Sequence, residues 1–179
     1  MDEKELWPDH KLSLVDVMYG AILTIGFVEG ADIKAINYGV IVRFALAYII
    51  IVMDWLQVHE AYREERRYPV GAFVLDLFIL FSISRLIYSS LQPAAVAYWG
   101  WMMGLFFLYS IWDLIMFRVC RLCRYDFKSA LIIDVFDFSL AGTFFLLSSQ
   151  KIVENEFLLE IPFIITYGVT LLVWEKRKR

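Results

Sequence analysis

Cysteine and histidine are nearly absent from this sequence of 179 residues, which has two of each. The cysteines, Cys120 and Cys123, are too few for a disulfide framework. No second CxxC pair and no nearby histidine completes a zinc site. A glycine-rich phosphate loop, a nucleophile elbow and an HExxH motif are also missing. We therefore expect no cofactor and no enzymatic activity.

Charge is scarce as well. The net charge of −3 provides no basic field for a nucleic acid. Hydrophobic residues make up 60% of the chain, and the mean hydropathy is +0.62. Soluble domains are about 45–50% apolar, and a domain of this size could not cover the excess with its own polar surface. The composition predicts an integral membrane protein with the lipid bilayer as its partner, built as a single domain over residues 1–179.

Long apolar runs divide this domain into membrane spans. A spanning helix needs about 20 mostly apolar residues, and a helix satisfies its own backbone hydrogen bonds in lipid. Polar and charged segments separate the runs, so the predicted fold is all-α, a bundle of six transmembrane helices. The predicted spans are 12–30, 36–58, 70–91, 94–117, 129–149 and 156–174.

The basic residues predict the orientation. With six spans, the two chain ends share a side with the second and fourth loops. That side carries thirteen of the 17 Lys and Arg residues, whereas the other carries only Lys34 and Lys151. Short loops rich in Lys and Arg stay in the cytoplasm. We therefore expect both termini to be cytoplasmic, in a multi-pass protein of the cell (inner) membrane.

Six carboxylates fall in the cytoplasmic half of the predicted spans. Asp134 and Asp137 are three residues apart on one helix face, so ionising both requires a cation, a basic partner or water between them. Asp16, Asp54 and Asp113 are close enough to the interface to reach water, which leaves a structural role open. The candidate residues of an ion path or of proton coupling are Asp76, Asp134, Asp137, Asp54, Asp113 and Asp16.

The outer half carries four charged residues at similar depth, Arg43, Arg85, Glu29 and Glu160. A charge near the bilayer centre costs about 2.5–3.5 kcal/mol on insertion scales. We expect both arginines to lie inside the protein and at least one to pair with Glu160 or Glu29. Such pairs either hold the spans together or act in selectivity or gating. Arg43 also shares a face of its span with Asp54, eleven residues further on.

The first two spans carry a motif-like pattern. The first begins "LSLVDVMYGAILTI" (12–25) and the second ends "DWLQVHEAY" (54–62). In the placement of Asp16, Thr24, Trp55, His59 and Tyr62, the chain resembles the endolysosomal potassium channel family and its small prokaryotic six-span homologues. That family's signature has Phe and Ser where Leu14 and Val15 stand here, and Arg where His10 stands.

The resemblance implies a tetrameric cation channel. In that family the first span lines the pore, and its aliphatic side chains form the gate. The residues that the resemblance places there are Ile22, Ile25 and Thr24.

Together, these features favour a homo-oligomeric membrane channel or transporter that passes a monovalent cation or proton (K⁺, Na⁺ or H⁺) along intramembrane carboxylates. One alternative is a non-conducting interaction or assembly protein whose buried ion pairs are structural. A further alternative is a metal-dependent, lipid-modifying membrane enzyme that uses Asp134 and Asp137.

Overall fold

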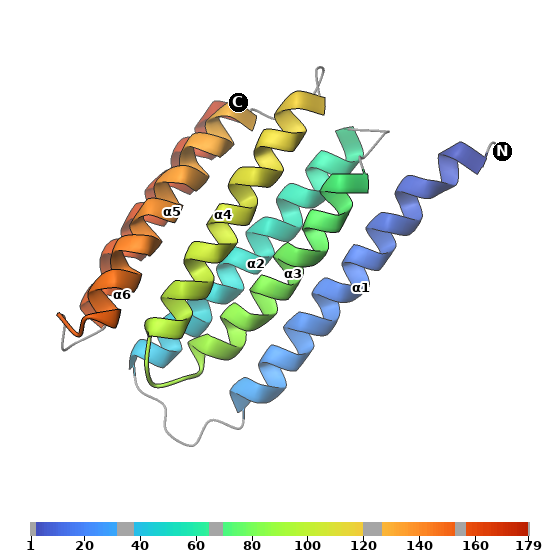
Figure 1. Cartoon of the computed structure of the whole chain (residues 1–179). Helices are drawn as coiled ribbons and strands as arrows, with labels where there is room; N and C mark the ends of the chain where they lie inside the picture. Colours follow the sequence, from blue (N-terminus) through green and yellow to red (C-terminus); the bar gives the residue numbers. More distant parts are fainter. Residues whose placement is uncertain (1–2, 32–37, 65–69, 120–126, 153–156, 179) are drawn as a thin grey trace.

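The computed structural model describes residues 3–31, 38–64, 70–119, 127–152 and 157–178. Within these ranges the chain is all-α, as the sequence predicts, and forms six helices (Figure 1). They are α1 (Glu3–Ala31), α2 (Tyr38–Glu64), α3 (Val70–Ser90), α4 (Val96–Val119), α5 (Phe127–Ser149) and α6 (Phe157–Lys178). Cys120 and Cys123 lie outside the described residues.

Five of the helices are long and apolar enough to cross a membrane. Their apolar segments are Ser13–Gly30, Tyr38–His59, Val70–Ser90, Val96–Arg118 and Lys128–Ser149, close to the first five predicted spans. In α6 the apolar segment among the described residues is shorter, Leu158–Thr170. By helix length and hydropathy the chain is a multi-pass membrane protein.

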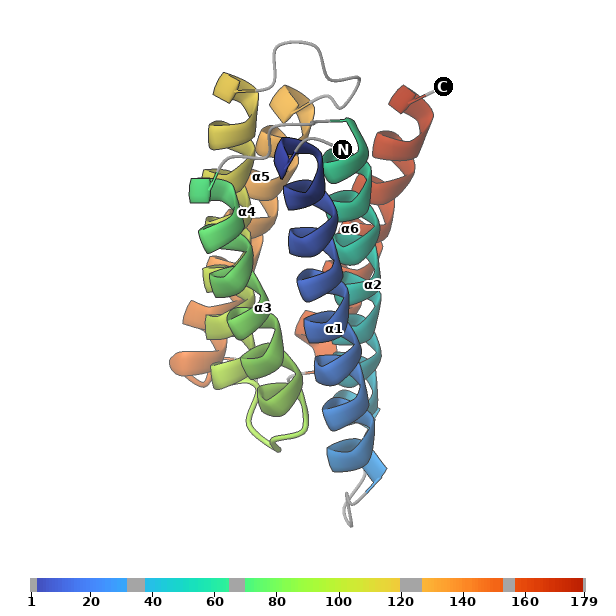
Figure 2. The same cartoon turned by 90° about the vertical axis from the view of Figure 1, so that its right-hand side faces the viewer.

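The helices run up and down as one bundle (Figures 1 and 2). Helices α2 to α6 each pack against the next in sequence, and α6 returns to pack against α2, so these five close a ring. Helix α1 lies outside the ring, against α2 and α3. The start of α1 and the end of α6 lie at the same end of the bundle in both views, called the terminal end below.

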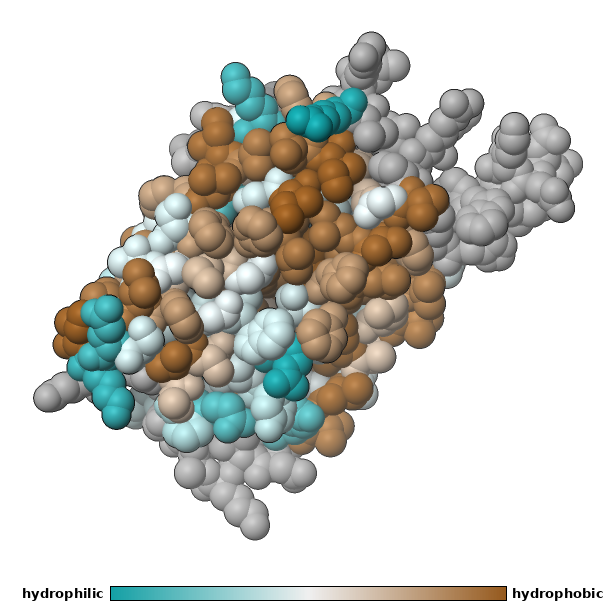
Figure 3. All heavy atoms as spheres, in the orientation of Figure 1, coloured by the Kyte–Doolittle hydropathy of each residue, from teal (hydrophilic) through white to brown (hydrophobic). Residues whose placement is uncertain are grey.

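Aromatic and aliphatic side chains fill the interior of the ring. Trp99 is fully buried on α4 and makes edge-on contacts with Phe144 of α5 and Phe163 of α6. Large apolar residues also cover much of the outside, and hydrophilic residues gather towards the two ends (Figure 3). An apolar outer surface of this kind suits lipid rather than water. Within this apolar interior, the buried charged residues are the unusual feature.

A close approach at Gly26 holds α1 against the ring. A Cβ there would lie 2.6 Å from the Tyr48 hydroxyl and 2.8 Å from a methyl group of Ile87. The Tyr48 hydroxyl donates a 2.7 Å hydrogen bond to the Leu23 carbonyl. Gly20, also on α1, has nothing within 4 Å of the same position.

We therefore expect Gly26→Ala to lower the free energy of unfolding by about 1–3 kcal/mol, the usual cost of overpacking. Thermal unfolding of the purified protein in detergent measures this effect. Gly20→Ala is the matched control, and its stability should equal or exceed that of the wild type because alanine favours a helix. Equal stability of the two variants would show that α1 packs differently.

Candidate functional site

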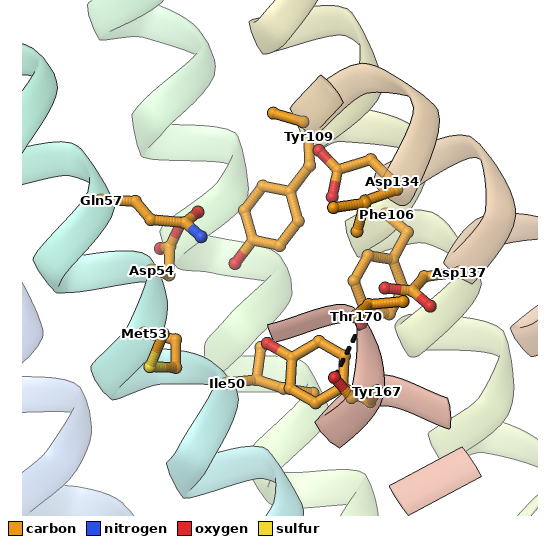
Figure 4. Close-up of a pocket in the computed structure, with 12 residues that line it drawn as sticks. Ile50, Met53, Asp54, Gln57, Phe106, Tyr109, Asp134, Asp137, Tyr167 and Thr170 are labelled. Atoms are coloured by element: carbon orange, nitrogen blue, oxygen red, sulfur yellow. Dashed lines mark hydrogen bonds between the residues drawn. The ribbon is translucent and has the colours of Figure 1, made fainter. Parts of the chain in front are cut away.

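Four helices surround a cavity of about 40 Å³ towards the terminal end of the bundle (Figure 4). Asp134 and Asp137 lie about two to three turns from the start of α5, at the depth the sequence predicts. The volume of the cavity exceeds the roughly 10–15 Å³ that one water molecule needs. The polar residues on the wall are Asp54 and Gln57 of α2, Tyr109 of α4, Asp134 and Asp137 of α5, and Tyr167 and Thr170 of α6. We call this cavity the carboxylate pocket.

Asp54 is buried and has tyrosines around it. It accepts a hydrogen bond from the Tyr19 hydroxyl of α1, 35 residues earlier in the chain. The Tyr109 hydroxyl also points towards Asp54 across the pocket (Figure 4). Hydroxyl donors can stabilise a carboxylate or exchange a proton with it. Asp54 is thus tied to α1 through the Tyr19 hydroxyl.

Asp137 has no such support. Its exposed fraction is 0%, and neither carboxylate oxygen has a hydrogen-bond partner among the residues that the structure describes. A buried charge without a partner costs several kcal/mol. A proton, a cation or water in the pocket would relieve this cost.

Asp113 and Asp134 bring carboxyl groups from α4 and α5 together. Both line a second, smaller cavity of about 10 Å³, which shares Asp54 and Tyr109 with the carboxylate pocket. Asp113 Oδ2 has no hydrogen-bond partner among the residues that the structure describes. Carboxyl groups gathered around one small cavity cannot all be ionised without compensation, so the arrangement suits a proton on at least one of them.

Basic side chains do not neutralise this cluster at close range. None of the described residues that line the two cavities is a Lys, Arg or His. Like charges at short range cannot all be ionised without compensation. Four aspartates from three helices therefore form a site suited to holding protons.

The metal-dependent alternative gains no support. Within the described ranges, no group of three or more His, Cys, Asp or Glu residues is placed to hold a metal ion. Asp76 lies apart from the pocket: it is buried on α3 but lines neither cavity. Of the candidate ion-path residues, Asp76 therefore lies outside the carboxylate pocket.

Asp16, Trp55 and His59 meet where α1 packs on α2. The indole nitrogen of Trp55 donates to Asp16 Oδ1 at 2.9 Å, and His59 Nε2 lies 3.0 Å from the same oxygen. His59 Nδ1 lies 3.0 Å from the Trp55 carbonyl. Of the residues that carry the family resemblance, these three are in contact, whereas the side chain of Tyr62 lies outside the described residues.

The residues expected to line a pore have mixed positions. Ile22 packs against the core, whereas Ile25 is 58% exposed. The Thr24 hydroxyl is on the exposed side and donates to the Gly20 carbonyl at 2.8 Å. Only Ile25 and Thr24 therefore face away from the bundle.

A second charged site lies towards the other end of the bundle. Arg43 of α2 and Glu160 of α6 form an ion pair with 2.9 Å between Nη1 and Oε1, and their exposed fractions are 1% and 0%. Arg43 Nη2 also donates to the carbonyl of Gln92 at 2.8 Å, in the turn between α3 and α4. Glu160 lies in the first turn of α6, where the helix dipole favours an acid. The sequence predicts that at least one of the two arginines pairs with Glu160 or Glu29, and Arg43 does so.

The expectation that Arg85 also lies inside the protein is not met in the single chain. Its side chain is exposed on α3, with the guanidinium carbon 5.2 Å from the Tyr88 ring centre and 5.6 Å from that of Trp101. Glu29 is exposed on α1 as well. Neither has an ion-pair partner among the residues that the structure describes. Arg85 lies close enough to the end of its helix to reach polar headgroups instead of a buried acid.

Sequence reasoning missed the tyrosines. Tyr19, Tyr109 and Tyr167 surround the carboxylates, but tyrosine is common in membrane spans and draws no attention alone. Tyr109 precedes Asp113 by one turn, and this spacing is the available sequence signal.

Comparisons with protein-family models, with curated proteins and with solved structures found no match. The class of the protein therefore follows from its fold and its site. It is a multi-span helical membrane protein with buried carboxylates.

Proposed function

We propose that this protein transfers protons, or a monovalent cation in their place, through the carboxylate pocket. The observation that carries the proposal is the convergence of Asp54, Asp113, Asp134 and Asp137 on two cavities that share lining residues, with no basic residue among the described residues of either lining. Intramembrane acids are expensive and typically mark ion or proton pathways. A proton suits the site better than K⁺ or Na⁺, because the cavity is small and three carboxyl groups, those of Asp54, Asp134 and Asp137, line it.

Polar groups continue from the pocket towards the other end of the bundle. Tyr167 lines the pocket and stacks on Phe163 with ring centres 6.0 Å apart. Tyr98 of α4 is also buried, and its hydroxyl has no hydrogen-bond partner among the described residues. We propose that these two tyrosines connect the pocket with the ion pair. The rings of Phe163 and its neighbours would keep bulk water from passing.

The orientation in the membrane is part of the proposal. We place the terminal end in the cytoplasm, in a cell membrane, with α6 as a sixth span, because the basic residues gather on that side. Single cysteines at Lys128, near the start of α5, and at Tyr38, the first residue of α2, test it in a chain in which Cys120 and Cys123 are replaced by serine. Both positions are exposed, and these two helices start at opposite ends of the bundle (Figure 1). In intact cells, an impermeant thiol reagent should label Tyr38→Cys but not Lys128→Cys. The reverse labelling pattern would invert the topology.

A cation channel formed by several copies is the second candidate. It is favoured by the contact of Asp16, Trp55 and His59, the residues that carry the family resemblance. The exposed face of α1 around Thr24 and Ile25 would then line a pore between copies. This reading predicts a K⁺-selective or Na⁺-selective current that does not depend on the carboxylate pocket.

Reconstitution into liposomes tests the proposal. With an imposed membrane potential and a trapped pH-sensitive dye, vesicles that contain the protein should acidify or alkalinise faster than empty vesicles. Replacing K⁺ with Na⁺ should leave this proton flux unchanged, whereas a channel of the second kind would show a K⁺ or Na⁺ current. Vesicles that pass none of the three ions would support the non-conducting alternative, for which the fully buried Arg43–Glu160 pair is the specific structural observation.

A further inference from the structure

The surface of α4 is hollowed near the end of the bundle opposite the terminal end. A groove of about 620 Å³ lies there between α4, α5 and the turn from α3 to α4. The groove is shallow and open to the surroundings of the bundle. Small residues create the hollow, since nothing lies within 4 Å of a Cβ built on Gly104. The lining includes Gln92, Ala97, Gly100, Trp101, Gly104 and Phe145.

Arg85 stands at the edge of this groove. Its guanidinium carbon lies 5.6 Å from the ring centre of Trp101, which lines the groove. Arg85 is exposed, and the part of the chain that the structure describes offers it no acidic partner. The residue lies five positions before the end of α3 at Ser90, or about 7.5 Å from it. An arginine at that depth reaches the headgroup level, where Trp and Tyr are also enriched.

From this arrangement we propose that the groove binds an anionic phospholipid. One acyl chain lies over Gly100 and Gly104, and the phosphate accepts hydrogen bonds from Arg85. An apolar groove beside an arginine that has no acidic partner among the described residues has the complementary charge for such a molecule. The site is independent of ion movement through the carboxylate pocket.

A second copy of the chain fits the observations less well. Small residues four apart, such as Gly100 and Gly104, permit close helix contact. In a symmetric contact each groove would face the other. The described lining contains no acidic residue, so Arg85 would stay without a counter-charge.

Native mass spectrometry of the purified protein in detergent, titrated with phosphatidylglycerol, tests the site. We expect the wild type to retain one lipid per chain. Gly104→Leu should abolish this binding, because leucine fills the groove where no atom obstructs it. Arg85→Gln should weaken it about tenfold through loss of a charge-assisted hydrogen bond to phosphate. Gly71→Leu is the matched control, since Gly71 also has nothing within 4 Å and lies at the start of α3.

Equal lipid retention by the wild type, Gly104→Leu and Arg85→Gln would overturn the proposal. The same holds if Gly104→Leu dissociates an oligomer while lipid retention stays at the wild-type level, because a second copy would then occupy the groove. Loss of lipid in Gly71→Leu as well would show that retention is not specific to the groove, which also overturns it.

Discussion

Arg43→Gln should lower the free energy of unfolding by about 3–5 kcal/mol, the usual cost of removing one partner of a buried ion pair. The change removes the cation that lies 2.9 Å from Glu160, whose own exposed fraction is 0%. It also removes the donor to the Gln92 carbonyl in the turn between α3 and α4. The variant therefore loses the contacts that join α2 to α6 and to the turn between α3 and α4. Equilibrium unfolding in mixed detergent micelles measures the loss.

Arg85→Gln is the matched control. Arg85 is the other arginine of the same half, but it is exposed, and its change should stay within about 0.5 kcal/mol of the wild type. A double variant, Arg43→Met with Glu160→Met, should recover much of the stability because no charge then stays buried. If Arg43→Gln were as stable as Arg85→Gln, the ion pair would not hold the bundle together.

The number of helices and their approximate bounds could be predicted because lipid imposes one condition on every span. Each span must be long and apolar, and charged segments must separate them. The first helix shows the limit of this reasoning. It begins at Glu3, well before the predicted start at residue 12, because a helix can continue past the apolar region into polar surroundings.

The depth of each charged residue in the membrane could also be predicted from its place in a span. The direction in which its side chain points around the helix axis requires a further comparison with its neighbours in the same helix. Arg43 and Asp54 are eleven residues apart, about three turns, and both are buried. Arg85 follows Asp76 by nine residues, or about two and a half turns, so the two point to opposite faces of α3. The burial of Asp76 therefore favours an outward direction for Arg85. That rule was available from the sequence and would have corrected the prediction for Arg85.

The composition of the carboxylate pocket could not be predicted in the same way. Depth places six aspartates in one half of the bundle but does not say which helices are neighbours. The ring brings α4 and α5 together and places α2 across from them, so Asp54, Asp113 and Asp134 share a cavity. Asp16 lies outside because α1 is not part of the ring.

Replacing an aspartate of the carboxylate pocket with asparagine should have the largest effect on transport. We expect Asp137→Asn to reduce proton flux per folded molecule by about a hundredfold, the lower end of what a positioned proton-transfer group contributes. Asparagine keeps the size of the side chain but cannot take up or release a proton. Because both oxygens of Asp137 lack hydrogen-bond partners among the described residues, removal of the charge should not destabilise the fold. Flux into reconstituted liposomes, normalised to folded protein, measures the effect.

Asp54→Asn and Asp134→Asn should behave in the same way, since both carboxyl groups line the pocket. Asp76→Asn is the matched control: it has the same chemistry and is buried in the same half of the bundle, but it lines neither cavity. Its flux per folded molecule should equal that of the wild type. A purely structural role of the aspartates leads to the opposite pattern, in which the pocket variants yield less folded protein and each folded molecule transports as before. Wild-type flux in all three pocket variants would therefore reject the pocket as the path and leave the exposed face of α1 as the place to look for one.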